Sequence, residues 1–404
     1  MVKEAPDITE IRKPEDIQDK ASKALTTLVN KIEKGELKAP SLFRDDKTII
    51  PVNQATWGLL DAINAAPTLK DWTDNEGETA PTHKTTLSGN KGAILVSMKG
   101  EEDFTRDTLP LLWNKVKGMS DLTSDVLLAC LAQWATTNEG NFNSPITITA
   151  DAILDARGIK RIRKPGEPDK WQHGHRSEDR IEVGRAIAQL DSLWIELFNV
   201  ETMPKGKGHK SSKLKVESRA LNITARAIQQ DFDGKNIFLA AHVTPGEWLK
   251  AYYDAGLRQM GILVRKALSY DPYRFKVEKD LTKYLAFHFK YNAGNQNEVI
   301  SRKVKTLLEG INMAPDTRNP QRTRVRLEKA LDQLQQDKVI KAWDYSTGRN
   351  SIDKTLPAKS WLGTWLEATI QITPPDDITA HYATLKHSPL SLNEADNETD
   401  KSNT

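Results

Sequence analysis

A dense group of basic side chains lies at residues 318–326, where polar residues that can also contact bases are interleaved. The group comprises Arg318, Gln321, Arg322, Arg324 and Arg326. A guanidinium donates two parallel hydrogen bonds to guanine, and a glutamine amide pairs in a similar way with adenine. Residues 299–330 hold 8 basic and 3 acidic side chains. This imbalance favours contact with a polyanion over a solvated surface of mixed charge.

The same group falls at the start of an expected helix over 321–337. Its core face is predicted to consist of apolar residues at helical spacing: Val325, Leu327, Leu331 and Leu334. Arg322 and Arg324 fall off that face near the N-terminal end, which is the end that helix-turn-helix proteins use to reach base edges. The preceding segment adds three cations suited to phosphates, namely Arg302, Lys303 and Lys305.

A second basic region surrounds an insertion expected to form a long hairpin at 202–217. Four of its lysines are candidate phosphate contacts: Lys205, Lys207, Lys210 and Lys213. Gly206 and Gly208 allow such a loop to follow a nucleic-acid backbone. A solubilising loop without a ligand is the alternative interpretation.

Another expected helix, over 177–192, carries three further candidate DNA contacts: Arg176, Arg180 and Arg185. Glu178, Asp179 and Glu182 lie among them and either repel phosphate or pair with the arginines. This helix is therefore predicted to be either a base-reading helix or a dimer or packing surface.

The known patterns of enzyme chemistry are weak in this sequence. The phosphate-binding pattern G-x-x-x-x-G-K-[ST] is absent. His173 and His175 resemble the histidine pair of some DNA nickases, which act with a tyrosine, but a glycine separates them in a predicted loop. Cys130 is the only cysteine, so an internal disulfide and a zinc–thiolate cluster are excluded. We predict a non-enzymatic protein without a metal or cofactor, an inert Cys130 and a structural His288.

The elements that must position these residues follow one order twice. In the second copy, helices are expected over 277–293, 299–311 and 321–337, and strands over 339–346 and 364–372 flank a polar hairpin. Three helices followed by a strand, a hairpin and a strand is the order of a winged helix, whose third helix enters the major groove of DNA.

The first copy has the same order with an insertion. It comprises a helix at 120–137, a strand at 146–149, a short helix ending before Gly158, the helix at 177–192, and strands at 193–201 and 219–227. The fold class expected is therefore mainly α with small β-hairpins (α+β), with two winged-helix domains in tandem and a helical N-terminal extension.

Composition shifts along the chain divide it into six predicted segments. These are a helical N-terminal extension at 1–72, a flexible linker at 73–92, a first winged-helix domain at 93–227, a helical connector at 228–276, a second winged-helix domain at 277–386 and a disordered acidic tail at 387–404. Residues 101–370 carry 42 basic and 34 acidic side chains, although the whole chain has a net charge of only +3. A basic body points to a nucleic-acid partner.

Two further classes are excluded or disfavoured by the sequence. The apolar runs are too short for a helix that crosses a bilayer. The first residues, MVKEAPDITEIRKPED, contain no apolar stretch typical of a secretory signal. We therefore expect a cytoplasmic protein with no membrane partner.

The chain resembles the replication initiator proteins of theta-replicating plasmids across about 109–373. The resemblance rests on LPLLWNKVKGMSDLTSDVLLACLAQWA with RIEVGRAIAQLDSLWIELFNVE in the first copy, and on VEKDLTKYLAFHFKYNAG with RVRLEKALDQLQQDKVIKAWDY and TWLEATIQI in the second. It implies tandem winged helices, a DNA-associated protein of the bacterial cytoplasm, and binding to repeated origin sequences through Gln321, Arg322, Arg324 and Arg326. It also implies dimerisation or backbone contact by the first domain.

Double-stranded DNA is therefore the predicted partner, with a second copy of the chain and replication proteins as further partners. A transcriptional repressor with the same fold is one alternative, because both functions require only a DNA-reading module. A nickase using His173, His175 and a tyrosine is another, and an RNA- or protein-binding scaffold is a third.

Overall fold

The computed structural model divides the chain into two compact units. Unit 1 comprises Met1–Lys279 and unit 2 comprises Asp280–Thr404. The structure describes residues 14–33, 42–43, 46–74, 79–86, 92–99, 107–137, 141–164, 167–171, 174–201, 213–231, 233–254, 259–293, 299–346 and 358–387. Both units combine helices with small antiparallel sheets, so the mixed α+β class is confirmed. The predicted acidic tail lies outside the described residues from position 388 onward.

The first part of unit 1 contributes strands as well as helices. Its elements are α1 (Pro14–Glu33), β1 (Lys47–Pro51), α2 (Gln54–Ala65), the short 3₁₀ helix η1 (Ala66–Thr68), β2 (Trp72–Thr73), β3 (Thr82–Thr86), β4 (Ala93–Met98) and α3 (Leu109–Lys117). β1 pairs with β12 (Met260–Val264), far along the chain. The prediction of a separate helical extension over 1–72 is therefore wrong.

The remainder of unit 1 contributes strands to four sheets and contains a buried helix. Its elements are α4 (Asp121–Thr137), β5 (Ile146–Thr149), α5 (Ala150–Ala156), β6 (Arg163–Lys164), β7 (Glu167–Trp171), α6 (Ser177–Ser192), β8 (Leu193–Glu201), β9 (Lys213–Arg219), β10 (Leu221–Gln230), β11 (Asn236–Pro245), α7 (Glu247–Asp254), β12, α8 (Lys266–Ser269) and the first turn of α9 (Lys276–Asn292).

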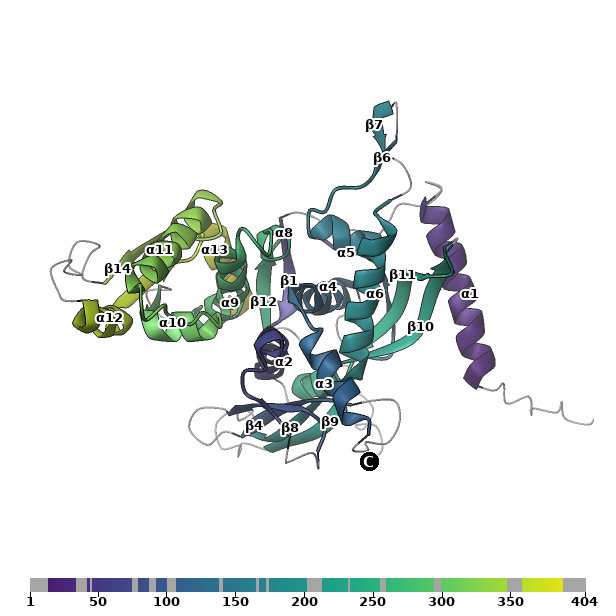
Figure 1. The fold of residues 1–404 in the computed structure, drawn as a ribbon, viewed down its shortest axis with the longest axis horizontal. Helices are drawn as coiled ribbons and strands as arrows, with labels where there is room; N and C mark the ends of the chain where they lie inside the picture. The colour runs from purple at the N-terminus through teal and green to yellow at the C-terminus, as the bar shows by residue number, and fades with distance from the viewer. Residues whose placement is uncertain are drawn as a thin grey trace, which may run out of the picture. The chain divides into compact units, whose positions relative to one another are not determined.

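A five-stranded antiparallel sheet has the order β2-β3-β4-β8-β9. Successive side chains of β8 point to opposite faces of this sheet. Leu193, Ile195 and Leu197 are fully buried on one face, whereas Phe198, on the other face, is 46% exposed. The helices α2 and α3 lie on the buried side of β4 (Figure 1). One face of this sheet is therefore part of the core of unit 1.

The predicted flexible linker at 73–92 contains a strand of this sheet. β3 pairs with β4 from Thr82↔Ser97 to Thr86↔Ala93. His83 on β3 is buried and contacts the ring of Trp72. Polar composition predicted a linker, but threonine has a high strand propensity and β4 supplies the apolar residues that β3 lacks. The linker prediction is wrong for residues 82–86.

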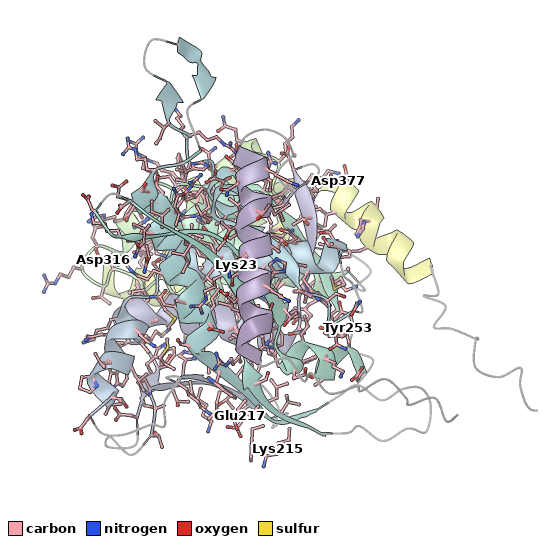
Figure 2. The ribbon with its side chains drawn as sticks, turned by 90° about the vertical axis from the view of Figure 1, so that its right-hand side faces the viewer. Lys23, Lys215, Glu217, Tyr253, Asp316 and Asp377 are labelled. Atoms are coloured by element: carbon pink, nitrogen blue, oxygen red, sulfur yellow. The ribbon has the colours of Figure 1, made fainter. Side chains whose placement is uncertain are left out.

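A three-stranded sheet of order β10-β11-β5 forms the second layer of unit 1. Leu25 and Val29 of α1 pack into a cluster with Ala227 of β10 and Leu239 of β11. Figures 1 and 2 show α1 lying along these strands, and Lys23 is on its exposed side. The amphipathic spacing of α1 thus attaches the N-terminal helix to unit 1.

The strand expected at 219–227 and the helical connector expected at 228–276 both need correction. β9 ends at Arg219 and β10 begins at Leu221, so the expected strand is shared between two sheets. β5 pairs with β11 and not with β10. The connector region contains the strands β11 and β12 as well as the short helices α7 and α8. The largely apolar run at 237–243 is buried as part of β11.

The helix α4 is the central core helix of unit 1. Every residue from Thr123 to Ala135 is buried. Cys130 lies within this stretch, and burial raises the pKa of its thiol to about 12. The predicted inert thiol is therefore confirmed as a buried, protonated side chain.

Unit 2 contains the rest of α9 together with further helices and strands. These are β13 (Ile300–Lys303), α10 (Val304–Gly310), α11 (Pro320–Gln336), β14 (Ala342–Tyr345), α12 (Ala358–Glu367), β15 (Thr369–Thr373) and α13 (Asp376–His387). The strands form one antiparallel sheet of order β13-β15-β14. The core of unit 2 includes Leu285, Ile300, Leu307, Leu331 and Trp365, all fully buried.

Two element boundaries in unit 2 differ from those expected. The helix expected at 299–311 begins with the strand β13, and the strand expected at 364–372 begins within α12. A further helix, α13, follows the last strand, and Asp376 and Asp377 form its first turn, where acidic residues are favoured. Most of the hairpin expected between β14 and the last strand, 347–357, lies outside the described residues.

Candidate nucleic-acid interface

The helix α11 is fixed at its N-terminal end by a cap and by the preceding turn. Pro320 occupies the first turn, and the side chain of Asn319 accepts a hydrogen bond from the Arg322 backbone N–H. In the turn, Asp316 Oδ1 accepts from the backbone of Arg318 at 2.9 Å, and the Asp316 backbone donates to Thr323 Oγ1 at 2.9 Å. The start of α11 is thus held in one orientation.

The buried side of α11 agrees with most of the predicted core face. Leu327, Leu331 and Leu334 are fully buried, as expected. Val325 is only partly buried, and Thr323 is buried in its place. This small rotation of the core face decides which arginines reach solvent.

The exposed side of α11 and its preceding turn carries a basic stripe. We use this term for Arg318, Gln321, Arg322, Arg326 and Lys329, which are all exposed. Residues 322, 326 and 329 are three or four positions apart and therefore share one helix face. The stripe brings four of the five predicted residues together, and it adds Lys329. Helical spacing from Arg322 and Arg326 could have identified Lys329 from the sequence.

The carboxylates of α11 are engaged elsewhere. Glu328 accepts hydrogen bonds from Arg324 and from Tyr345, and Asp332 accepts one from the Trp343 indole at 3.0 Å. Among the described residues, no carboxylate forms an ion pair with Arg322, Arg326 or Lys329. The stripe therefore presents positive charge that the described part of the protein does not itself neutralise.

Arg324 does not belong to this surface. Its residue exposure is 5%, and its guanidinium bonds Glu328 at 2.7 Å and lies over the rings of Tyr345 and Trp361. Burial raises the pKa of Tyr345, which donates to Glu328 and accepts from the Trp365 indole. The prediction that Arg324 contacts DNA is therefore corrected: it is a core residue of unit 2.

The cations expected on the second helix fall on β13 and at the start of α10. Arg302 is half-buried beside His288, at 3.3 Å between nitrogens, and Lys303 pairs with Glu367 at 2.6 Å. Lys305 is exposed on α10. Of the three, Lys305 alone is exposed without a hydrogen bond or ion pair to another side chain among the described residues, whereas Arg302 and Lys303 contact other side chains of unit 2.

His288 has the structural role that the sequence predicted. Its ring packs against that of Tyr284 in a tilted arrangement, with 3.9 Å between centroids. Burial, together with the positive charge of Arg302, lowers the pKa of His288 to about 3. The imidazole is therefore neutral at physiological pH and is part of the packing of α9.

The helix α6 of unit 1 presents a different surface. Arg180 is buried and forms two 2.8 Å bonds to the carboxylate of Asp151. Arg185 is exposed and pairs with Glu182 at 2.6 Å, while Arg176 is exposed at the N-cap. The prediction that Arg180 contacts DNA is corrected, because its guanidinium is an internal ion-pair partner.

The histidine pair considered for nickase chemistry is only partly described. His173 lies outside the described residues. His175 is buried, with Nε2 3.0 Å from Asp155. Burial alone would raise the pKa of Asp155, but hydrogen bonds from His175 and Arg161 lower it to about 2. Among the described residues, no group of three or more His, Cys, Asp or Glu side chains is placed to hold a metal ion.

The insertion lysines lie at the edge of what the structure describes. Lys205, Lys207 and Lys210 are outside the described residues, and Lys213 is placed in β9 by its backbone only. Further along β9, Lys215 and Glu217 are exposed and share one side of the strand (Figure 2). The predicted phosphate contacts of Lys205, Lys207 and Lys210 therefore stay a prediction.

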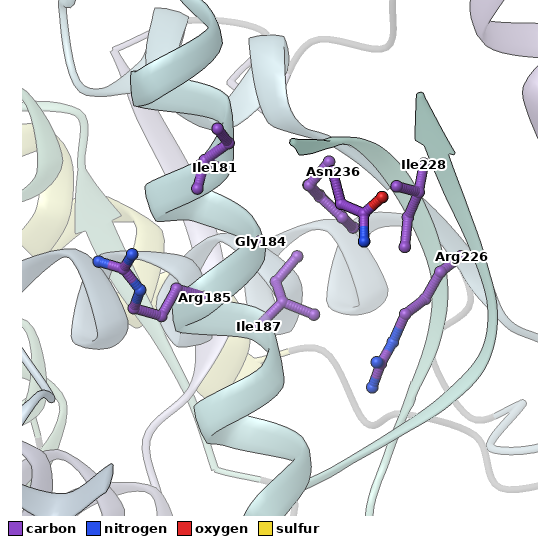
Figure 3. Close-up of a pocket in the computed structure, with 8 residues that line it drawn as sticks. Ile181, Gly184, Arg185, Ile187, Arg226, Ile228 and Asn236 are labelled. Atoms are coloured by element: carbon purple, nitrogen blue, oxygen red, sulfur yellow. The ribbon is translucent and has the colours of Figure 1, made fainter. Parts of the chain in front are cut away.

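A shallow open pocket lies between α6 and the strands β10 and β11 (Figure 3). Ile181 and Ile187 line it from α6, and Arg226 and Ile228 line it from β10. Arg226 pairs with Asp191 at 2.8 Å. The apolar floor and the paired arginine make this pocket a poor phosphate site.

Among the helices that the structure describes, none combines the length and the apolar character needed to span a bilayer.

Comparison with known proteins gives only a remote structural likeness. No family model and no curated protein matches the sequence. A crystal structure of RctB domains 2-3 overlaps 79% of this chain and 99% of its own, with 11% identity and a TM-score of 0.34. A second structure of RctB domains 2 and 3 gives 77% and 99%, with 11% identity and a TM-score of 0.35. Likeness at this level carries no argument about the function of this protein.

Proposed function

We propose that this protein binds double-stranded DNA in a sequence-specific manner, with α11 of unit 2 as the reading helix. The observation that carries the proposal is the basic stripe, which places arginine and glutamine side chains on the exposed face at the N-terminal end of a capped helix. Arginine and glutamine are the side chains that pair bidentately with guanine and adenine.

The architecture of unit 2 supports this proposal. Its elements run α9, β13, α10, α11, β14, α12, β15 and α13, and β15 pairs with both β13 and β14. We infer a winged helix from a helix-turn-helix, α10 and α11, whose three-stranded sheet combines β13 before it with β14 and β15 after it, although α12 lies between the last two strands. In such a module the second helix of the helix-turn-helix enters the major groove.

We further propose that the bound sites are the repeats of a replication origin, so that the protein is a replication initiator. This finer assignment is supported by the sequence resemblance over about 109–373. A repressor with the same module would bind at a promoter. We assign no catalytic step to the protein.

Selection of duplexes from a random pool by the full chain, followed by sequencing, tests the DNA-binding proposal. We expect one enriched motif that is retained at about 150 mM salt, where non-specific binding is weak. Repeats of that motif beside an AT-rich segment support the initiator role, whereas a match confined to a promoter supports repression. Failure to enrich any motif contradicts specific binding.

Incubation with supercoiled DNA carrying the selected motif, with Mg²⁺ or Mn²⁺, tests the non-enzymatic assignment. We expect the DNA to remain supercoiled and the protein to remain free of DNA after denaturation. A nicked product with a covalent 5′ linkage to a tyrosine would overturn the assignment. It would favour the alternative of a nickase that uses His173 and His175.

A further inference from the structure

The turn between α8 and α9, within unit 1, carries two exposed aromatic side chains. Tyr273 is 90% exposed and Phe275 is 38% exposed. The ring of Tyr273 therefore presents nearly its whole planar face to solvent, where a planar partner can stack on it. The position is unusual beside the other tyrosines of this region, since Tyr252, Tyr253 and Tyr270 are all buried.

The turn is held in a defined shape. Asp271 Oδ1 accepts hydrogen bonds from the backbone N–H groups of Tyr273 at 2.9 Å and Arg274 at 2.8 Å. At its end, the ring of Phe275 packs on the buried ring of Tyr270, 5.9 Å between centroids. Tyr273 therefore projects from a preorganised backbone, which reduces the entropic cost of binding a ligand.

The segment that contains Tyr273 carries mostly positive charge between residues 265 and 276. Residues 265–276 include four exposed cations: Arg265, Lys266, Arg274 and Lys276. Asp271 is the only acidic residue of that segment, and its carboxylate faces the backbone of its own turn. A ring flanked directly by Arg274, with Lys276 close by, thus combines a stacking surface with cations for phosphate.

We propose that the turn at 271–276 binds single-stranded nucleic acid by stacking Tyr273 on an unpaired base. Aromatic residues interleaved with cations are the means by which proteins bind single strands without reading sequence. A duplex exposes base edges in its grooves but covers base faces by stacking. A tyrosine ring therefore cannot stack on a base within an intact duplex. Arg274 and Lys276 bind the adjoining phosphates.

This site is separate from the basic stripe of α11, and its ligand differs from the duplex of the proposed function. The proposal does not require the duplex assignment to be correct. Either activity can therefore fail in experiments without the other.

Fluorescence anisotropy of the full chain with a labelled oligothymidine tests the site. We expect Tyr273→Ala to weaken binding about tenfold, consistent with the removal of one base–aromatic stack, and Tyr273→Phe to bind within about twofold of the wild type. Leu111→Ala is the matched control, because Leu111 is also exposed, at 64%, but belongs to α3. Leu111→Ala should leave oligothymidine binding unchanged.

The variant Arg274→Gln provides a second readout that does not depend on stacking. Removal of this charge should reduce the slope of log affinity against log salt by about 0.7, the value for one phosphate contact on a single strand. Binding of the selected duplex by Tyr273→Ala should equal that of the wild type.

Three results would overturn the proposal. Unchanged oligothymidine affinity in Tyr273→Ala would remove the stacking role. An equal loss of affinity for duplex and single strand would indicate general backbone contact. Loss of binding to anionic vesicles of phosphatidylglycerol by Tyr273→Ala, with oligothymidine binding intact, would assign the turn to a lipid surface.

Discussion

The helices α6 and α11 hold the same position in the two predicted copies but present opposite surfaces. On α6, Glu178 and Glu182 are exposed and Arg185 is paired with one of them. On α11, the acidic side chains are used internally, and Arg322 and Arg326 face solvent. Both helices carry several arginines, so the placement of the acids distinguishes the basic face of α11, proposed to read DNA, from the exposed face of mixed charge on α6.

The largest loss of stability is expected on replacing Arg180, the buried arginine of α6. The change Arg180→Ala leaves Asp151 without its two-bond partner in a buried setting, and removal of one member of such a pair typically costs about 3–5 kcal/mol. Urea denaturation of the full chain measures it. A loss below about 1 kcal/mol would show that Arg180 is not a structural residue.

A pH-dependent effect is expected in unit 2, where His288 packs within the same unit as α11. The unfolded imidazole takes up a proton near pH 6.5, but the folded one does so only near pH 3. The unfolded state therefore binds more protons between these values, and unit 2 loses up to about 1.4 kcal/mol per pH unit as the pH falls from about 6 to about 4. His288→Leu should show a flatter melting-temperature profile, measured by circular dichroism. An identical slope in both proteins would contradict the burial of a neutral His288.

A smaller effect is expected for the four insertion lysines of unit 1. Replacement of Lys205, Lys207, Lys210 and Lys213 by glutamine should weaken specific and non-specific duplex binding alike, because phosphate contacts carry no sequence information. The salt slope should fall by about 0.9 for each phosphate that the variant no longer neutralises. A salt titration on selected and scrambled duplexes measures both quantities. Weakening confined to the selected duplex would instead indicate base reading by the hairpin.

The smallest effect is expected at Arg185, which lies on α6 near Arg180 but is exposed. Arg185→Ala removes a surface ion pair with Glu182 and should change the free energy of unfolding by less than about 0.5 kcal/mol. The same denaturation experiment serves as its measurement. A destabilisation as large as that of Arg180→Ala would remove the distinction between buried and surface arginines on this helix.

The sequence predicted the helices better than the sheets. α4, α6, α9 and α11 were expected within a few residues of their observed bounds, because their apolar spacing is helical over three or more turns. β3 was missed because its residues are polar and its apolar partners come from β4. β11 was missed because a short apolar run is compatible with either a helix or a strand until its neighbours are known.

The position of the basic stripe could be predicted from the sequence, but not which arginines belong to it. Arg322 and Arg324 are two residues apart, which is about 200° around a helix, so they cannot share a face. The spacing of apolar residues along the helix does not show which of the two arginines is buried. Arg324 is buried because its guanidinium contacts Glu328, Tyr345 and Trp361. Tyr345 and Trp361, from elements outside the helix, decide that choice.

The most direct test of the central claim compares Arg322→Ala on α11 with Arg185→Ala on α6. Anisotropy titrations of each variant use the selected duplex and a scrambled duplex at one salt concentration. The account predicts that Arg322→Ala loses about 1–3 kcal/mol on the selected duplex and much less on the scrambled one, while Arg185→Ala binds both as the wild type does. Equal losses of affinity by Arg322→Ala on the two duplexes, or a sequence-dependent loss in Arg185→Ala, would contradict the assignment of α11 as the reading helix.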